Sequence, residues 1–186
     1  MNVPEIFKYN SVISVPLFTI IALLLIKRAP EFSFLKSTVS KSIFHLRGKT
    51  YRIIFRLNFI LKSLLDFGFA LYLMNRFEIS PKSFLGFFLI LSFIFFGLLA
   101  YFIESKHSVI HKILVYSGGV FWAICQILLS QYTKNGKFIF FTYVSTFIAI
   151  VLAFSFLFVK KTNVIVQAVC MFLLYSWLTI FVFQYL

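Results

Sequence analysis

Residues 51–74 read YRIIFRLNFILKSLLDFGFALYLM, an apolar run whose polar side chains recur at helical spacing. About 20 apolar residues are needed to cross the roughly 30 Å hydrocarbon core of a bilayer as a helix. At 100° per residue, the polar side chains fall within an arc of roughly 160°. They are Arg52, Arg56, Asn58, Lys62, Ser63 and Asp66. The stretch therefore predicts a membrane helix with one polar side and one side of Leu, Ile and Phe.

The acid in this helix, Asp66, lies near the expected midplane of the membrane, where an unpaired charge costs several kcal/mol. Lys62 is four residues earlier, so the two side chains can meet on one face. We expect Asp66 to be paired, protonated or turned toward a polar cavity. Three interpretations stay open: an ion pair that only fixes helix packing, a functional cavity or ion path that includes Asn58 and Ser63, and a different span assignment in which Arg52 and Arg56 lie at the interface. Arg56 is expected to extend to the interface.

The rest of the chain contains further apolar stretches of similar length. Six apolar stretches meet or approach the length of a membrane span, and they lack the alternation of barrel strands. We predict an all-α, polytopic membrane bundle with six transmembrane helices, forming a single domain over residues 1–186. The predicted spans are about 9–27, 52–74, 83–103, 109–131, 138–159 and 163–185.

Composition supports the same class. Of the 186 residues, 61% are hydrophobic and 12% are charged, whereas soluble domains carry about 25% charged residues. The net charge of +13 does not indicate nucleic-acid binding, because the basic residues lie mostly in short connections and form no patch on a soluble segment. Cys125 and Cys170 both lie in apolar runs, which argues against a disulfide framework.

The distribution of Lys and Arg predicts the orientation. The first, third and fifth connections hold Lys27, Arg28, Lys36, Lys41, Arg47, Lys49, Arg52, Lys106, Lys112, Lys160 and Lys161. The opposite side holds Lys8, Arg76, Lys82, Lys134 and Lys137. Because basic connections stay in the cytoplasm, we expect these three connections to be cytoplasmic and both termini to be outside. An organellar inner membrane is an alternative location.

Several polar and ionisable side chains lie just before the fourth predicted span and along it. Glu104 and His107 are interfacial candidates, and His111 and Gln126 lie on a polar stripe along the helix. Two histidines four residues apart can bind a metal, but zinc needs a third protein ligand, and the residue after His107 is Ser108 rather than a glutamate base. His107 and His111 are therefore weak metal candidates, and we expect no metal and no cofactor. Nucleotide loops and nucleophile elbows are also lacking in the sequence.

Three motifs, STVSKS (37–42), FRLNFILKSLLDFGFALYL (55–73) and VIHKILVYSGG (109–119), occur in an order that resembles a known family. This is a bacterial and archaeal family of six-helix membrane proteins of unknown function, related to the DRAM and Sfk-like membrane proteins of eukaryotes. The sequence departs from the family pattern at Lys41, where an acid is expected. The resemblance implies a small polytopic protein linked to lipid or membrane homeostasis. It also singles out Thr38, Ser40 and His111.

Three functions are compatible with these features. The first is a non-enzymatic membrane protein that binds lipid or supports membrane homeostasis, with a polar cavity inside the bundle. The second is an intramembrane metal-dependent enzyme, or a transporter of protons or a small solute. The third is a structural subunit of a larger membrane complex. The expected partner is membrane lipid, with a second copy of the chain or a membrane complex as an alternative.

Overall fold

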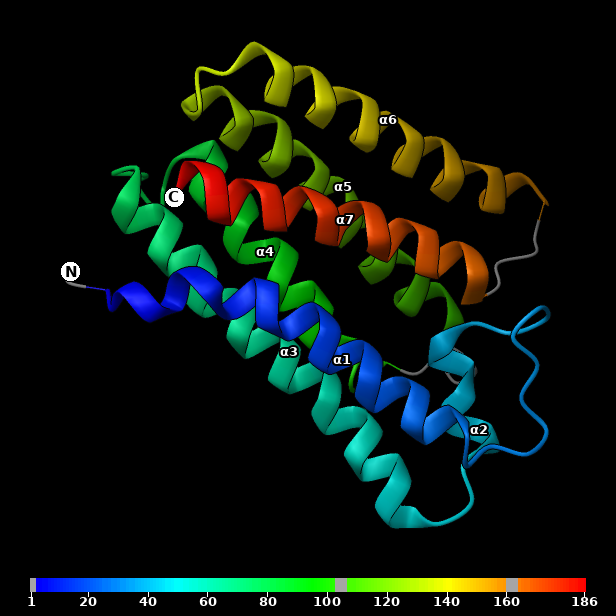
Figure 1. The fold of residues 1–186 in the computed structure, drawn as a ribbon. Helices are drawn as coiled ribbons and strands as arrows, with labels where there is room; N and C mark the ends of the chain where they lie inside the picture. The colour runs from blue at the N-terminus through cyan, green and yellow to red at the C-terminus, as the bar shows by residue number, and fades with distance from the viewer. Residues whose placement is uncertain (1–2, 103–106, 160–163) are drawn as a thin grey trace.

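The computed structural model describes residues 3–102, 107–159 and 164–186, with the helix but not the side chains of 154–159. These residues form helices and contain no strand, so the all-α prediction is confirmed (Figure 1). The elements are η1 (Glu5–Tyr9), α1 (Asn10–Ile26), η2 (Val39–Lys41), α2 (Ser42–His45), α3 (Lys49–Arg76), α4 (Phe84–Leu98), α5 (Ser108–Tyr132), α6 (Gly136–Val159) and α7 (Val164–Tyr185).

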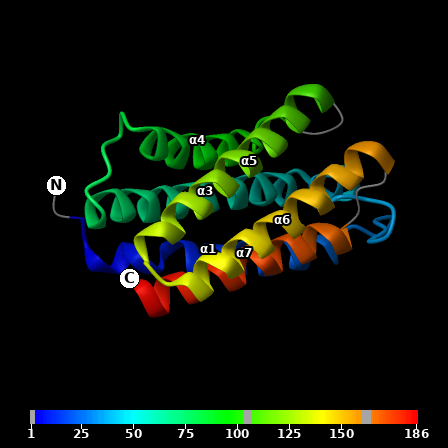
Figure 2. The same ribbon diagram turned by 90° about the horizontal axis from the view of Figure 1, so that it is seen from above.

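The six long helices form a closed ring. Each of α1, α3, α4, α5 and α6 packs against the next long helix in the sequence, and α7 packs against both α6 and α1. The two chain ends lie at the same end of the bundle, and the first connection, residues 27–48, lies at the other (Figure 1). Viewed from above, α5 and α6 are close at the terminal end and separate toward the other end (Figure 2).

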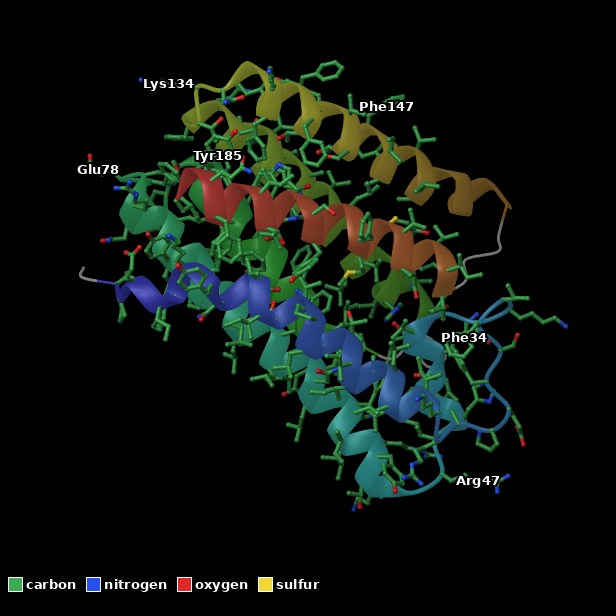
Figure 3. All side chains as sticks on the ribbon, viewed as in Figure 1. Phe34, Arg47, Glu78, Lys134, Phe147 and Tyr185 are labelled. Carbon is green, nitrogen blue, oxygen red and sulfur yellow. The ribbon has the colours of Figure 1, made fainter. Side chains whose placement is uncertain are left out.

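Length and composition suit most of these helices to a membrane. Five helical segments are long and apolar enough to cross one: Glu5–Ile26, Lys49–Arg76, Ser108–Tyr132, Gly136–Ala153 and Val164–Tyr185. Their outer faces expose large apolar side chains such as Leu64, Phe147 and Phe172, each at least 63% exposed. In Figure 3, Phe147 projects from the outer side of α6, while Arg47 and Lys134 lie at opposite ends of the bundle. Exposed apolar surface of this extent suits contact with lipid.

The remaining long helix, α4, is shorter than the span predicted at 83–103. It begins where the Ser83 hydroxyl accepts a hydrogen bond from the Gly86 N–H, and it ends at Leu98. Fifteen residues at 1.5 Å each extend about 22 Å, which is less than the roughly 30 Å hydrocarbon core. Apolar residues continue to Phe102, but the chain tightens into turns, with the Ala100 N–H bonded to the Gly97 carbonyl at 3.1 Å. The predicted end of this span was therefore wrong.

Two groups of buried residues hold the ring together. The terminal end is filled by side chains from all six long helices, including the fully buried Leu89, Leu129, Trp177 and Phe181. The second group joins α1, α3, α4 and the start of α5 to the first connection, whose Leu46 is also fully buried. Between them, the middle of the ring is left less completely filled.

Candidate functional site

A buried ion pair lies on the inner face of α3. Lys62 and Asp66 are one helical turn apart, are 5% and 2% exposed, and join the ammonium Nζ to Oδ2 of the carboxylate. The pairing follows from the i, i+4 spacing, which places both side chains on one face. In a low-dielectric interior, the two charges stabilise each other only if their remaining hydrogen-bonding capacity is also satisfied.

Helix α1 supplies the remaining partners of the carboxylate. The Ser11 hydroxyl donates to Asp66 Oδ1 at 2.8 Å, and the Ser14 hydroxyl donates to the same oxygen. Ser11 and Ser14 are three residues apart, so they share one face of α1, and that face packs on α3. Asp66 thus has three donor groups as partners, and both of its side-chain oxygens are engaged.

The ammonium of Lys62 has a second stabilising contact. Its Nζ lies 4.8 Å from the centroid of the Phe96 ring on α4, within the range of a cation–π interaction. The pair is therefore held by three helices, α1, α3 and α4. Its net charge is zero, and its acidic and basic groups both have partners.

This pair forms part of the wall of a central cavity. The cavity has a volume of about 450 Å³ and is lined by residues of α1, α3, α4, α5, α6, α7 and the first connection. Most of its wall is apolar and aromatic, with Phe93, Phe96, Leu114, Met171 and Leu174 among the lining residues. Sites for small ligands commonly measure about 300–1,000 Å³ and combine apolar walls with a few polar groups.

The side of the cavity formed by α5 and α6 carries further polar groups. Gln126 is 7% exposed, and its side chain lines the cavity together with Trp122 and Thr146. The indole Nε1 of Trp122 and the hydroxyl of Thr146 are buried without a hydrogen-bond partner in the described residues. Buried polar atoms are nearly always paired in folded proteins, so these unpaired atoms are unusual.

The two ends of the cavity differ. Toward the chain termini, Trp122 and Leu178 line it. Trp177 packs behind Trp122, with the two rings edge to face, and its indole N–H donates to the Thr142 hydroxyl at 2.8 Å. At the opposite end, Val39 and Ser40 of the first connection line it, and the Val39 N–H donates to Gln167 Oε1 of α7 at 2.9 Å. The first connection is thereby attached across the ring to the start of α7.

The other polar residues expected on α3 serve helix packing. The Asn58 side chain donates from Nδ2 to the Phe18 carbonyl of α1 at 2.9 Å, and the Ser63 hydroxyl donates to the Phe93 carbonyl of α4 at 2.8 Å. Neither residue lines the central cavity. Each hydrogen bond gives a polar side chain a partner inside the apolar bundle, and together they attach α3 to its neighbours α1 and α4.

The two histidines at the start of α5 point into different surroundings. His111 is buried, and its Nδ1 lies 2.8 Å from the Phe102 carbonyl. It lines a separate cavity of about 10 Å³ with Arg56 and Ser40, which is room for about one water molecule. His107 is exposed and packs edge to face on Phe102. Within the described residues, no three His, Cys, Asp or Glu side chains gather as metal ligands, and Glu104 lies outside them.

The motif of the first connection has a local structural role. The Thr38 hydroxyl accepts a hydrogen bond from the Lys41 N–H and caps η2. Ser40 is the member of this motif that lines both cavities. The predicted site residues thus separate into those on the central cavity (Lys62, Asp66, Gln126 and Ser40) and those outside it (Asn58, Ser63, Arg56, His107, His111 and Thr38).

Sequence reasoning did not single out Ser11, Ser14 or Thr146 as site residues. The Ser-x-x-Ser spacing in the first span was the available signal for the two serines, since it places two hydroxyls on one helix face.

No protein-family model, curated protein or solved structure matches this chain.

Proposed function

We propose that the chain is an integral membrane protein, with six crossing helices, that binds an apolar or amphiphilic lipid-derived molecule in its central cavity. The observation that carries this proposal is a cavity of about 450 Å³ whose wall is mostly apolar and contains one buried ion pair. A lipid-like molecule matches such a wall because its hydrocarbon part needs apolar contacts and its head needs a few polar groups.

The outer surface supports the membrane part of the proposal. Large apolar side chains are exposed on every long helix, as with Ile20, Leu64, Phe87, Ile113 and Phe147. Helix α4 is short for a span, and a bilayer accommodates a short helix by local thinning at modest cost. The basic first, third and fifth connections are then cytoplasmic, as the Lys and Arg distribution indicates.

The ion pair has a structural role under this proposal. Its oxygens and ammonium are already partnered by Ser11, Ser14 and the Phe96 ring, so it organises α1, α3 and α4 around one wall. No bond to the ligand has to be made or broken by a titrating group. This arrangement favours binding over catalysis.

The test is lipid retention by the purified full-length protein. The protein is extracted in a mild detergent and its bound molecules are identified by native mass spectrometry and by mass spectrometry of an organic extract. Ala149→Phe places a ring into the cavity from α6, and Ala168→Phe makes the same change at an exposed position of α7 that does not line the cavity.

We expect a lipid-derived molecule at close to one per chain in the unchanged protein and in Ala168→Phe. In Ala149→Phe the retained amount should fall by about tenfold, because the added ring occupies space that the ligand needs. Absence of any bound molecule from the unchanged protein, or equal retention by both variants, would contradict the proposal.

A further inference from the structure

The side chain of Gln126 is a polar group that faces the cavity and is open to a ligand there. It is 93% buried, it lines the central cavity, and in the described part of the chain its carboxamide forms no hydrogen bond. A carboxamide has two donors and an acceptor oxygen, so it can bind a polar ligand atom that enters the cavity. The Gln126 carboxamide is therefore available to bind a polar atom of a ligand.

Two further unpaired groups lie on the same side of the cavity. Trp122 precedes Gln126 by four residues and so lies on the same face of α5, while Thr146 comes from the neighbouring helix α6. The Trp122 Nε1 can only donate, and the Thr146 hydroxyl can donate or accept. Both atoms are covered by neighbouring side chains, so a ligand in the cavity reaches Gln126 first.

The charges of the cavity limit which ligand can be accepted. Among the described lining residues, the charged side chains are Lys62 and Asp66, and each is the ion partner of the other. A ligand with a net charge would be buried without a counter-ion, which is strongly unfavourable in a low-dielectric interior. An uncharged oxygen has no such penalty.

We propose that Gln126 is a ligand-binding residue that recognises an uncharged oxygen group, such as a hydroxyl or an ester, on an otherwise apolar chain. The apolar part lies against Phe93, Leu114 and Met171, and the oxygen group is bound by the carboxamide on α5. The ligand class is a neutral lipid rather than a fatty acid or a cationic amphiphile. This inference rests on the proposed lipid-binding function and specifies the ligand.

The test uses three probes with the same 18-carbon chain and different heads. They are 1-monooleoylglycerol, which is neutral, oleate at pH 9, which is anionic, and oleylamine at pH 7, which is cationic. Binding to the purified full-length protein in detergent is measured by competition with a radiolabelled monooleoylglycerol, with matched detergent and ionic strength. We expect the neutral probe to bind at least tenfold more tightly than either charged probe.

Two variants test the residue. Gln126→Leu removes the carboxamide with little change in volume and should weaken monooleoylglycerol binding about fivefold to tenfold, which is the effect of one lost hydrogen bond. It should leave the binding of octadecene, which has no head, within about twofold. Gln131→Leu changes an exposed glutamine on the same helix, outside the cavity lining, and should bind like the unchanged protein.

The outcomes separate the two proposals. Equal or tighter binding of oleate or oleylamine by the unchanged protein overturns the neutral-head inference while lipid binding stands, and this comparison does not depend on any variant folding. Unchanged monooleoylglycerol affinity in a folded Gln126→Leu overturns the role of Gln126. If none of the four probes (monooleoylglycerol, oleate, oleylamine and octadecene) binds to the unchanged protein, the lipid-binding function itself fails.

Discussion

The buried pair of Lys62 and Asp66 makes a quantitative prediction about stability. Lys62→Met removes the ammonium and leaves a buried carboxylate with only the Ser11 and Ser14 hydroxyls as donors. Asp66→Asn removes the negative charge and leaves a buried ammonium facing an amide and the Phe96 ring. Breaking a buried ion pair from one side typically costs about 3–5 kcal/mol, because the remaining charge is uncompensated.

The double variant Lys62→Met/Asp66→Asn should be much less harmful than the two single effects added together. With both charges gone, neither position is left with an isolated buried charge, and replacing both members of a buried pair is often close to neutral. We therefore expect a coupling energy of about 2 kcal/mol or more, whereas independent sites add within roughly 0.5 kcal/mol.

The measurement is a double-mutant cycle of unfolding free energies, obtained by titrating mixed micelles with denaturing detergent and following helix content by circular dichroism. Lys112→Met serves as the control, because Lys112 is exposed on α5, and it should change stability by less than about 0.5 kcal/mol. Additive single effects, or single variants as stable as the control, would refute the pairing argument.

Two further predictions concern close approach and attachment of the first connection. A Cβ at Gly86 would lie 2.2 Å from the Ser80 carbonyl oxygen, so Gly86→Ala should destabilise the bundle by about 1–3 kcal/mol in the same unfolding assay. Gly119→Ala is the control, because a Cβ there meets no atom within 4 Å, and it should not destabilise the bundle. Similar stability of the two variants would contradict the close contact at Gly86. Gln167→Ala removes the acceptor of the Val39 N–H, so trypsin should cut the first connection about fivefold faster at a fixed protease ratio, as for a loss of about 1 kcal/mol. Gln184→Ala at the other end of α7 is the matched control, and equal cleavage rates would count against the attachment.

The hydrophobic pattern was sufficient to predict the helices but not all of their ends. Predicted and observed bounds agree within three residues at nearly every helix end, because apolar length is what defines each segment. The exception is the end of α4, where the composition stays apolar through Phe102 while the backbone turns after Leu98. Hydropathy does not register a turn made from apolar residues.

The site was predictable where it depends on one helix and not where it depends on two. The Lys62–Asp66 contact follows from i, i+4 spacing alone. The role of Ser11 and Ser14 depends on which face of α1 packs on α3, and serine is also common as a small packing residue in membrane helices. His111 shares a helical stripe with Gln126, yet a connection that brings the Phe102 carbonyl to its ring gives it separate surroundings.

The closed ring also bears on how the protein is synthesised. Each long helix packs against the one made just before it, whereas the contact between α7 and α1 joins the last helix to the first. Chains emerge from the ribosome N-terminus first, so the partial ring of α1, α3, α4, α5 and α6 exists before α7. In the membrane protein proposed above, the future cavity is at that stage a trough open along one side to the bilayer. Insertion of α7 then encloses it, and the molecules available for enclosure at that moment are those of the surrounding membrane.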